Sequence, residues 1–253
     1  MRHSVFCTAV LSALPALVGA HDITIWPVLS DAQLRLEVRY GHPGEYETPF
    51  LGRLVTLDLW SPSGERRPLA GRLRLDGQSM VMTPTALTPA SPGTWVLAGF
   101  YDNAFALTTA DGRTVNTTLN EYPTATRSVH NLNFAKALVR SGRESGGFDR
   151  VIGHRLELVP RADPFGVTPG PDTTVPIEVR FNGQPLPDVS VFAFVNPDRA
   201  ETVPMISDAQ GQVRVKIARR GLQILTVEHE ADSPHRDVSL RNFHAASLVF
   251  VVP

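Results

Sequence analysis

The chain has 253 residues, and its 24 Lys and Arg against 25 Asp and Glu give a formal net charge of −1. A nearly neutral chain lacks the basic surface with which proteins bind nucleic acid or anionic lipid, so we expect neither partner. The single cysteine excludes a scaffold held together by internal disulfides.

Residues 1–20 have the pattern of a secretory signal peptide. Arg2 precedes an apolar stretch over 5–18, and small residues precede the expected cleavage after Ala20. The stretch is shorter than the roughly 20 apolar residues that span a bilayer, so we expect a periplasmic protein without membrane insertion after cleavage. Cleavage removes Arg2 and Cys7, so the 24 basic residues become 23 and no thiolate remains. Any metal site in the mature chain is then built from nitrogen and oxygen donors.

The region 21–141 has the pattern of an all-β domain. Residues 33–40 alternate strictly between apolar and charged side chains, which is the period of a half-buried strand. Further strands are predicted between turn signals, over 54–60, 72–75 and 94–101. Short strands separated by turns predict an antiparallel β-sandwich.

One segment departs from this pattern. Residues 128–140 contain good helix formers and no proline, and Gly142 follows as a stop signal. They predict one short helix near 129–140, with a strand that has a helical tail as the open alternative. The glycine- and serine-rich residues that follow predict a linker over 142–152.

About seven short strands are predicted in residues 153–253. Residues 175–181 alternate and run into Asn182 and Gly183, a strong signal for a tight hairpin turn. Residues 189–195 are almost wholly apolar, as suits a strand buried on both faces. Seven strands in roughly 100 residues predict an immunoglobulin-like or transthyretin-like sandwich. The expected fold is therefore all-β, with one β-sandwich domain on each side of the linker.

Cleavage after Ala20 makes His21 the first residue of the mature chain. A terminal histidine offers an α-amine and an imidazole, which together chelate one ion such as Ni(II), Co(II) or Cu(II). The alternative is a histidine left at a mobile terminus without a function. Asp22 adds a carboxylate to the site or is an ordinary residue at the start of a strand.

Four further residues are candidate metal ligands: His42, Glu45, His130 and His244. His42 and Glu45 lie in a turn-rich loop after a predicted strand, where functional side chains are common. His130 is near the start of the predicted helix, and His244 precedes the last predicted strand. Each of these histidines also has an ordinary structural interpretation, in a turn or packed against its neighbours.

Several short segments carry a resemblance to a known family: 20–22 (Ala-His-Asp) with Trp26, Gly41-His42, 134–138, 153–160 with Asp163-Pro164, 181–191, 207–211 and Gly221-Leu222. In these segments the chain resembles a family of bacterial exported proteins known as periplasmic components of cobalt or nickel uptake systems, a nickel uptake transporter family that contains a domain of unknown function. The resemblance covers essentially the whole chain and implies the handling of nickel or cobalt. The turns and strands of the second half are also similar to carboxypeptidase-regulatory-like domains, which are structural modules.

Three functions follow as hypotheses. The first is a protein without catalytic activity that binds a divalent transition metal, nickel or cobalt with copper as a third option, as an ion or a metal complex. It would deliver the metal to a membrane transporter component and would need no organic cofactor. The second is a β-sandwich scaffold or interaction module in which the histidines are incidental. The third is a copper-dependent oxidase, because copper enzymes that cleave polysaccharides also begin with histidine on a β-sandwich. No sequence motif of a hydrolase, zinc protease or phosphate-binding loop is present.

Overall fold

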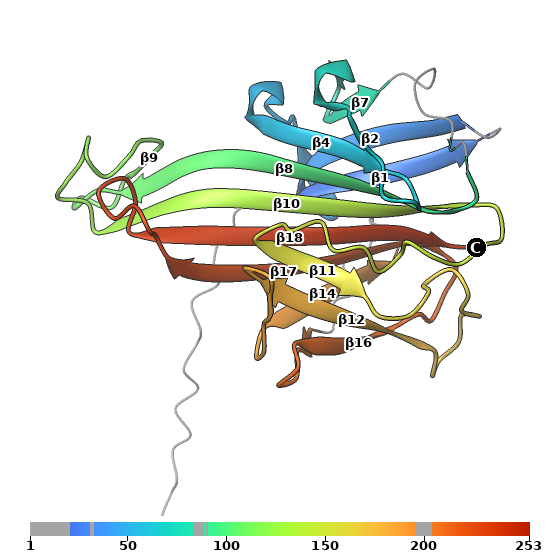
Figure 1. Ribbon diagram of the computed structural model, residues 1–253. Coiled ribbons are helices and arrows are strands. Elements are labelled where there is room, and N and C mark those ends of the chain that lie inside the picture. Colours follow the sequence, from blue (N-terminus) through green and yellow to red (C-terminus); the bar gives the residue numbers. More distant parts are fainter. Residues whose placement is uncertain (1–20, 31–32, 83–88, 90, 196–203) are drawn as a thin grey trace, which may run out of the picture.

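The computed structural model describes residues 21–30, 33–82, 89, 91–195 and 204–253 (Figure 1). Their regular structure is strands together with two single-turn 3-10 helices, Leu51–Arg53 and Ala70–Arg72, which confirms the predicted all-β fold class. In these ranges no helix has the length and apolar character needed to cross a membrane. The expected signal peptide, residues 1–20, lies outside the described residues.

A nine-stranded central sheet contains strands from both halves of the chain. Its order is β15-β14-β17-β18-β10-β8-β4-β5, with β9 paired to β8. Neighbouring strands are antiparallel except β10 and β18, which run parallel. The strands are β4 (Leu54–Trp60), β5 (Arg66–Pro68), β8 (Gly93–Thr108), β9 (Thr114–Val115), β10 (Arg127–Ser141), β14 (Ser190–Val195), β15 (Met205–Ile206), β17 (Gly221–Asp232) and β18 (Arg241–Val252).

Two smaller sheets cover the two faces of the central sheet (Figure 1). We call the covered faces the N face and the C face. The long strands β8, β10, β17 and β18 project past both smaller sheets at one end, on the left in Figure 1. The N face is covered by β1 (Ile23–Ser30), β2 (Gln33–His42), β3 (Glu45–Glu47), β6 (Leu73–Asp76) and β7 (Ser79–Met82), and the C face by β11 (Leu156–Pro160), β12 (Thr174–Phe181), β13 (Gln184–Pro185) and β16 (Gln212–Lys216).

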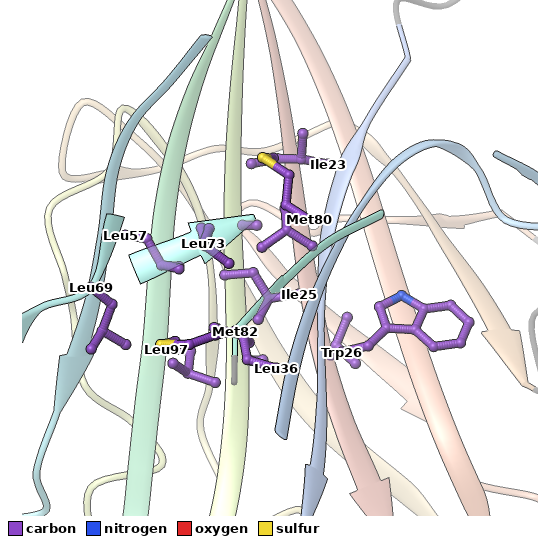
Figure 2. Close-up of a cluster of buried hydrophobic side chains, with 14 of the residues drawn as sticks. Ile23, Ile25, Trp26, Leu36, Leu57, Leu69, Leu73, Met80, Met82 and Leu97 are labelled. Carbon is purple, nitrogen blue, oxygen red and sulfur yellow. The ribbon is translucent and has the colours of Figure 1, made fainter. Parts of the chain in front are cut away.

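The central strands supply side chains to two hydrophobic cores. Successive side chains of a strand point to opposite faces, so Ala135 and Ala137 of β10 join the core on the N face, whereas Phe134 and Leu138 join the core on the C face. Figure 2 shows the core on the N face, where side chains of the smaller sheet meet those of β4 and β8, among them Ile25, Leu36, Met80, Leu57 and Leu97.

The predicted short helix near 129–140 is wrong, because β10 continues as one strand from Arg127 to Ser141. Smaller sheets cover both faces of β10, and every residue from Asn131 to Val139 is buried. A strand buried on both faces loses the alternation of polar and apolar side chains, and periodicity then no longer distinguishes it from a helix. The alanines that favoured a helix are the small side chains of β10 beneath the smaller sheet.

The expected linker, residues 142–152, connects β10 to β11. Strands from both sides of this segment are hydrogen-bonded in the central sheet, where β10 and β18 pair from Val129 with Arg241 to Ala137 with Val249. The division into two domains at this segment stays a prediction.

Candidate functional site

The pairing of β1 with β2 places His21 opposite His42. Ile23 pairs with Tyr40, and the Gly41 N–H donates to the Asp22 carbonyl at 2.9 Å, so the ladder continues past the first residue of β1. One further step brings His21 and His42 together. Their rings meet edge to face, with centroids 5.2 Å apart and planes at 86°.

This separation suits two imidazoles that share one ion. A nitrogen bound at about 2.0–2.1 Å puts its ring centroid about 3.2 Å from the ion, so two rings on one ion have centroids between about 4.5 Å, for donors at a right angle, and about 6.4 Å, for donors on opposite sides. The observed 5.2 Å lies between these limits. The residue types and their spacing therefore fit a transition metal.

The carboxylate beside His21 belongs to Glu47 rather than to the predicted Glu45. Glu47 Oε2 lies 3.4 Å from His21 Nδ1. Nδ1 is the ring nitrogen that closes a six-membered chelate ring with the α-amine of the same residue, so Glu47 lies beside the nitrogen that an N-terminal chelate would use. Glu45 pairs with His42 at the start of β3 and is exposed.

The hairpin that carries His42 and Glu47 depends on Gly41. Its φ of +125° is a backbone conformation that favours glycine, and a Cβ there would lie 2.3 Å from the Glu45 carbonyl oxygen. Gly41 thus allows β3 to fold closely back on β2, which positions His42 and Glu47 at the same end of the sheet.

The residues that follow the expected cleavage point are anchored to the central sheet. Asn133 Nδ2 donates to the His21 carbonyl, and Ser247 Oγ donates to the Ile23 carbonyl at 2.6 Å. The Asp22 side chain is only 3% exposed, and its burial, followed by the nearby Glu228 carboxyl, raises its pKa well above the usual value. Asp22 thus lies buried near Glu228, and we do not count it among the ligands.

The structure does not bring His130 or His244 to His21. On β10, Asn133 points to the N face, where it bonds His21, whereas Leu132 lies in the core on the C face. His244 pairs with Leu132 across the parallel strands and therefore points to the C face. The central sheet separates the two groups of histidines.

His244 has the surroundings of a buried structural histidine. It is 1% exposed, its Nδ1 lies 3.3 Å from the His229 carbonyl oxygen, and its ring lies edge-on to Phe181 with centroids 5.0 Å apart. Burial lowers its pKa to about 4. The neutral imidazole is the favoured form at this position.

His130 lines a cavity of about 520 Å³ on the C face, together with His154, His235 and the ring of Phe134. Its Nε2 is 2.8 Å from Asp102 Oδ1. Within the described ranges, no group of three or more His, Cys, Asp or Glu side chains is arranged to hold a metal. The pair of His21 and His42 reaches three nitrogen donors only when the α-amine of His21 is free.

A second cavity, of about 410 Å³, lies on the N face beside His21. Tyr40, Arg53, Asn103 and Arg127 line it. Sequence reasoning did not find Arg53 and Asn103, since neither belongs to a motif and the two are 50 residues apart.

Residues 18–231 match the family model described as a domain of unknown function, DUF4198. No curated protein matches the chain.

Three solved structures are similar at 11–13% identity. The tetra-tandem repeat in the extending region of a large adhesion protein has a TM-score of 0.24, with 91% of this chain and 49% of that one covered. The fibronectin(III)-like modules of Clostridium thermocellum CbhA have a TM-score of 0.21, with 94% and 92% covered. Native alpha-2-macroglobulin from Escherichia coli, spanning domains MG0-NIE-MG1, has a TM-score of 0.21, with 86% of this chain and 94% of that one covered. This chain spans about half the length of the adhesion-protein chain.

Proposed function

The chain belongs to the DUF4198 family, whose function is unknown, and we propose that it binds one divalent transition-metal ion in the periplasm and delivers it to an uptake system. The metal is nickel or cobalt, with copper as a third option. The observation that carries the proposal is the pair of His21 and His42, with ring centroids 5.2 Å apart.

Cleavage after Ala20 would complete the donor set. The freed α-amine and Nδ1 of His21 would chelate the ion, and His42 would add a third nitrogen. Nitrogen donors of this type suit nickel, cobalt and copper, and the Glu47 carboxylate beside Nδ1 adds a negative charge next to the ion. The hydrogen bond from Asn133 holds His21 in place, so little ordering of the terminus is needed when the ion binds.

The exposure of the site supports a carrier rather than a structural metal centre. The His21 side chain is 32% exposed and that of Glu47 is 61% exposed. Structural sites are closed by four protein ligands, whereas this set leaves positions open to solvent. An ion held at such a site can be passed to a partner.

Titration calorimetry with Ni(II) in a non-coordinating buffer tests the proposal. Four forms of the mature chain are compared: the native form that begins at His21, a form with one alanine before His21, His42→Ala, and His235→Ala as the control. His235 is an exposed histidine beside the other cavity, so its variant removes an imidazole without touching the site.

We expect the native form and the control to bind one ion per chain. The Ni(II) affinity of the extended form and of His42→Ala should each fall by more than the roughly 10–100-fold that is lost when a residue hydrogen-bonded to a metal ligand is removed. Equal affinity of the native and extended forms would contradict the chelate. Peroxide-driven oxidation of a polysaccharide by the copper-loaded chain would favour the oxidase instead.

A further inference from the structure

The cavity beside His21 is rich in hydrogen-bond donors and has no carboxylate among its described lining residues. Two guanidinium groups, Arg53 and Arg127, line it together with the carboxamides of Asn103 and Asn131. Its volume of about 410 Å³ corresponds to roughly a dozen water molecules at about 30 Å³ each, which is enough for a small organic anion.

Arg53 is the cation that lacks an acidic partner. Arg127 is paired with Glu230 at 3.2 Å, but Arg53 makes no ion pair with any part of the chain that the structure describes. Its Nη1 donates to Asn103 Oδ1 at 2.8 Å, and the guanidinium also interacts with the Tyr101 hydroxyl, so its described partners are neutral. A half-buried guanidinium without a carboxylate partner is a strong site for a carboxylate or phosphate.

Asn103 adds further donors. Its Oδ1 accepts from both Arg53 and the Tyr40 hydroxyl, which lies at 3.1 Å. With Oδ1 occupied in this way, the carboxamide offers its Nδ2 hydrogens to the cavity. The same Tyr40 ring lies 5.1 Å from the His21 ring, centroid to centroid, so the donors adjoin the histidine pair.

A β-bulge in β8 keeps the neighbouring carboxylate out of this cavity. The pairing shifts from His130 with Phe105 to Leu132 with Asp102, so Asn103 and Ala104 together lie opposite Asn131. Asp102 turns to the C face, where it bonds His130 at 2.8 Å, and Asn103 faces the N face.

We propose that this cavity binds a small di- or tricarboxylate that also coordinates the metal, so that the protein takes up the metal as a carboxylate complex. The inference rests on the proposed function. An anion that lies between the guanidinium of Arg53 and the bound metal is attracted by both positive charges. Its oxygens would fill coordination positions that His21 and His42 leave open.

The test is calorimetry of the mature chain with Ni(II) alone, citrate alone, and the two combined. We expect a complex of one chain, one nickel and one citrate, with Ni(II)–citrate bound at least about 10-fold more tightly than citrate alone, that is, by about 1.4 kcal/mol or more. Arg53→Met should lose at least about 10-fold in this affinity and keep its affinity for Ni(II) alone. Arg74→Met is the matched control, because Arg74 is an exposed arginine on β6, in the smaller sheet over the N face.

Asn103→Asp distinguishes a direct loss of citrate affinity from a loss that is caused by misfolding. The aspartate keeps both acceptor contacts, with Tyr40 and Arg53, but it pairs Arg53 and places a negative charge in the cavity. It should abolish citrate binding without a lower unfolding midpoint.

The outcomes separate the two proposals. Absence of Ni(II) binding without citrate would overturn the proposed function. The anion site would then be tested by the binding of citrate alone, which must weaken in Arg53→Met. If the chain binds Ni(II) but citrate only strips the metal away, or if Arg53→Met behaves like Arg74→Met, the anion site is wrong and the metal site stands.

Discussion

Lys136 and Glu157 form an ion pair in the interior, with Nζ 2.8 Å from Oε1 and both side chains 1% exposed. Lys136 also donates to the carbonyls of Arg150 and Leu158, and Glu157 accepts from the N–H groups of Ile152 and Gly153. Burial alone would raise the pKa of Glu157, but the Lys136 ammonium and the Ile152 N–H hold it below its usual value. The pair therefore joins β10 to the segment that leads into the cavity on the C face.

Lys136→Met should lower the free energy of unfolding by about 3–5 kcal/mol, because it leaves a buried carboxylate without its partner. Urea denaturation near neutral pH measures the loss. Lys136→Met combined with Glu157→Gln should recover part of it. Lys216→Met, at an exposed lysine of β16, is the control and should change stability by less than about 0.5 kcal/mol. Similar losses of stability in Lys136→Met and Lys216→Met would show that the buried ion pair does not stabilise the fold.

The buried histidines predict a loss of stability in mild acid. Burial lowers the pKa of His154 and of His244 to about 4, below the unfolded value of about 6.5. The unfolded chain therefore binds more protons between these values, and stability that is complete above pH about 6.5 declines as the pH falls toward about 4. The slope is about 1.4 kcal/mol per pH unit for each histidine.

Urea denaturation at several pH values checks this slope. His244→Leu should remove about half of it, while His235→Leu, at an exposed position, should leave it unchanged. If stability does not change between pH about 6.5 and about 4, the folded chain binds as many protons as the unfolded chain, and the two imidazoles are then protonated in the folded protein as well.

Gly41→Ala should weaken metal binding through the backbone. The new methyl group would meet the Glu45 carbonyl, so β3 must move away from β2 and carry Glu47 away from His21. We expect at least about a 10-fold loss of Ni(II) affinity by calorimetry, or about 1.4 kcal/mol. Gly77→Ala is the matched control, since Gly77 also has positive φ but a Cβ there meets nothing within 4 Å. A loss of affinity in both variants would point to general destabilisation.

Ala104→Gly should stabilise the protein. Ala104 has a φ of +61°, and the left-handed conformation costs a residue with a Cβ about 1–2 kcal/mol. Glycine removes this cost but loses about 0.5–1 kcal/mol of backbone entropy, so the net gain is about 0.5–1 kcal/mol. Thermal unfolding measures it. Ala106→Gly, two residues along the same strand, should instead destabilise, and equal effects of the two changes would exclude relief of strain at the bulge.

The sequence locates one half of the proposed metal site better than the other. His21 follows from the expected cleavage point, and the alternation over 33–40 predicts the strand that carries His42. Glu45 and Glu47 are two residues apart and share a face of the strand. Which of the two carboxylates lies beside His21 depends on how closely β3 folds back at Gly41. That is a property of packing which no local pattern encodes.

The wrong helix and the two distant histidines both arise from the central sheet. Because this sheet is covered on both faces, β10 is an apolar segment without the period of a strand, and the prediction of a helix near 129–140 was wrong. His130 and His244 were candidate ligands because histidines carry no mark of the face to which they point. Only the parallel pairing of β10 with β18, between residues more than 100 positions apart, places them across the sheet from His21.

The same pairing sets the order in which the molecule can be assembled. β18 lies between β10 and β17, and its side chains enter both hydrophobic cores. Arg241–Val252 is synthesised after the other strands that the structure describes, so neither core is complete before β18 has been added. Both cores are therefore completed only when β18 pairs with β10 and β17. Contacts this distant in sequence also make that final step slow.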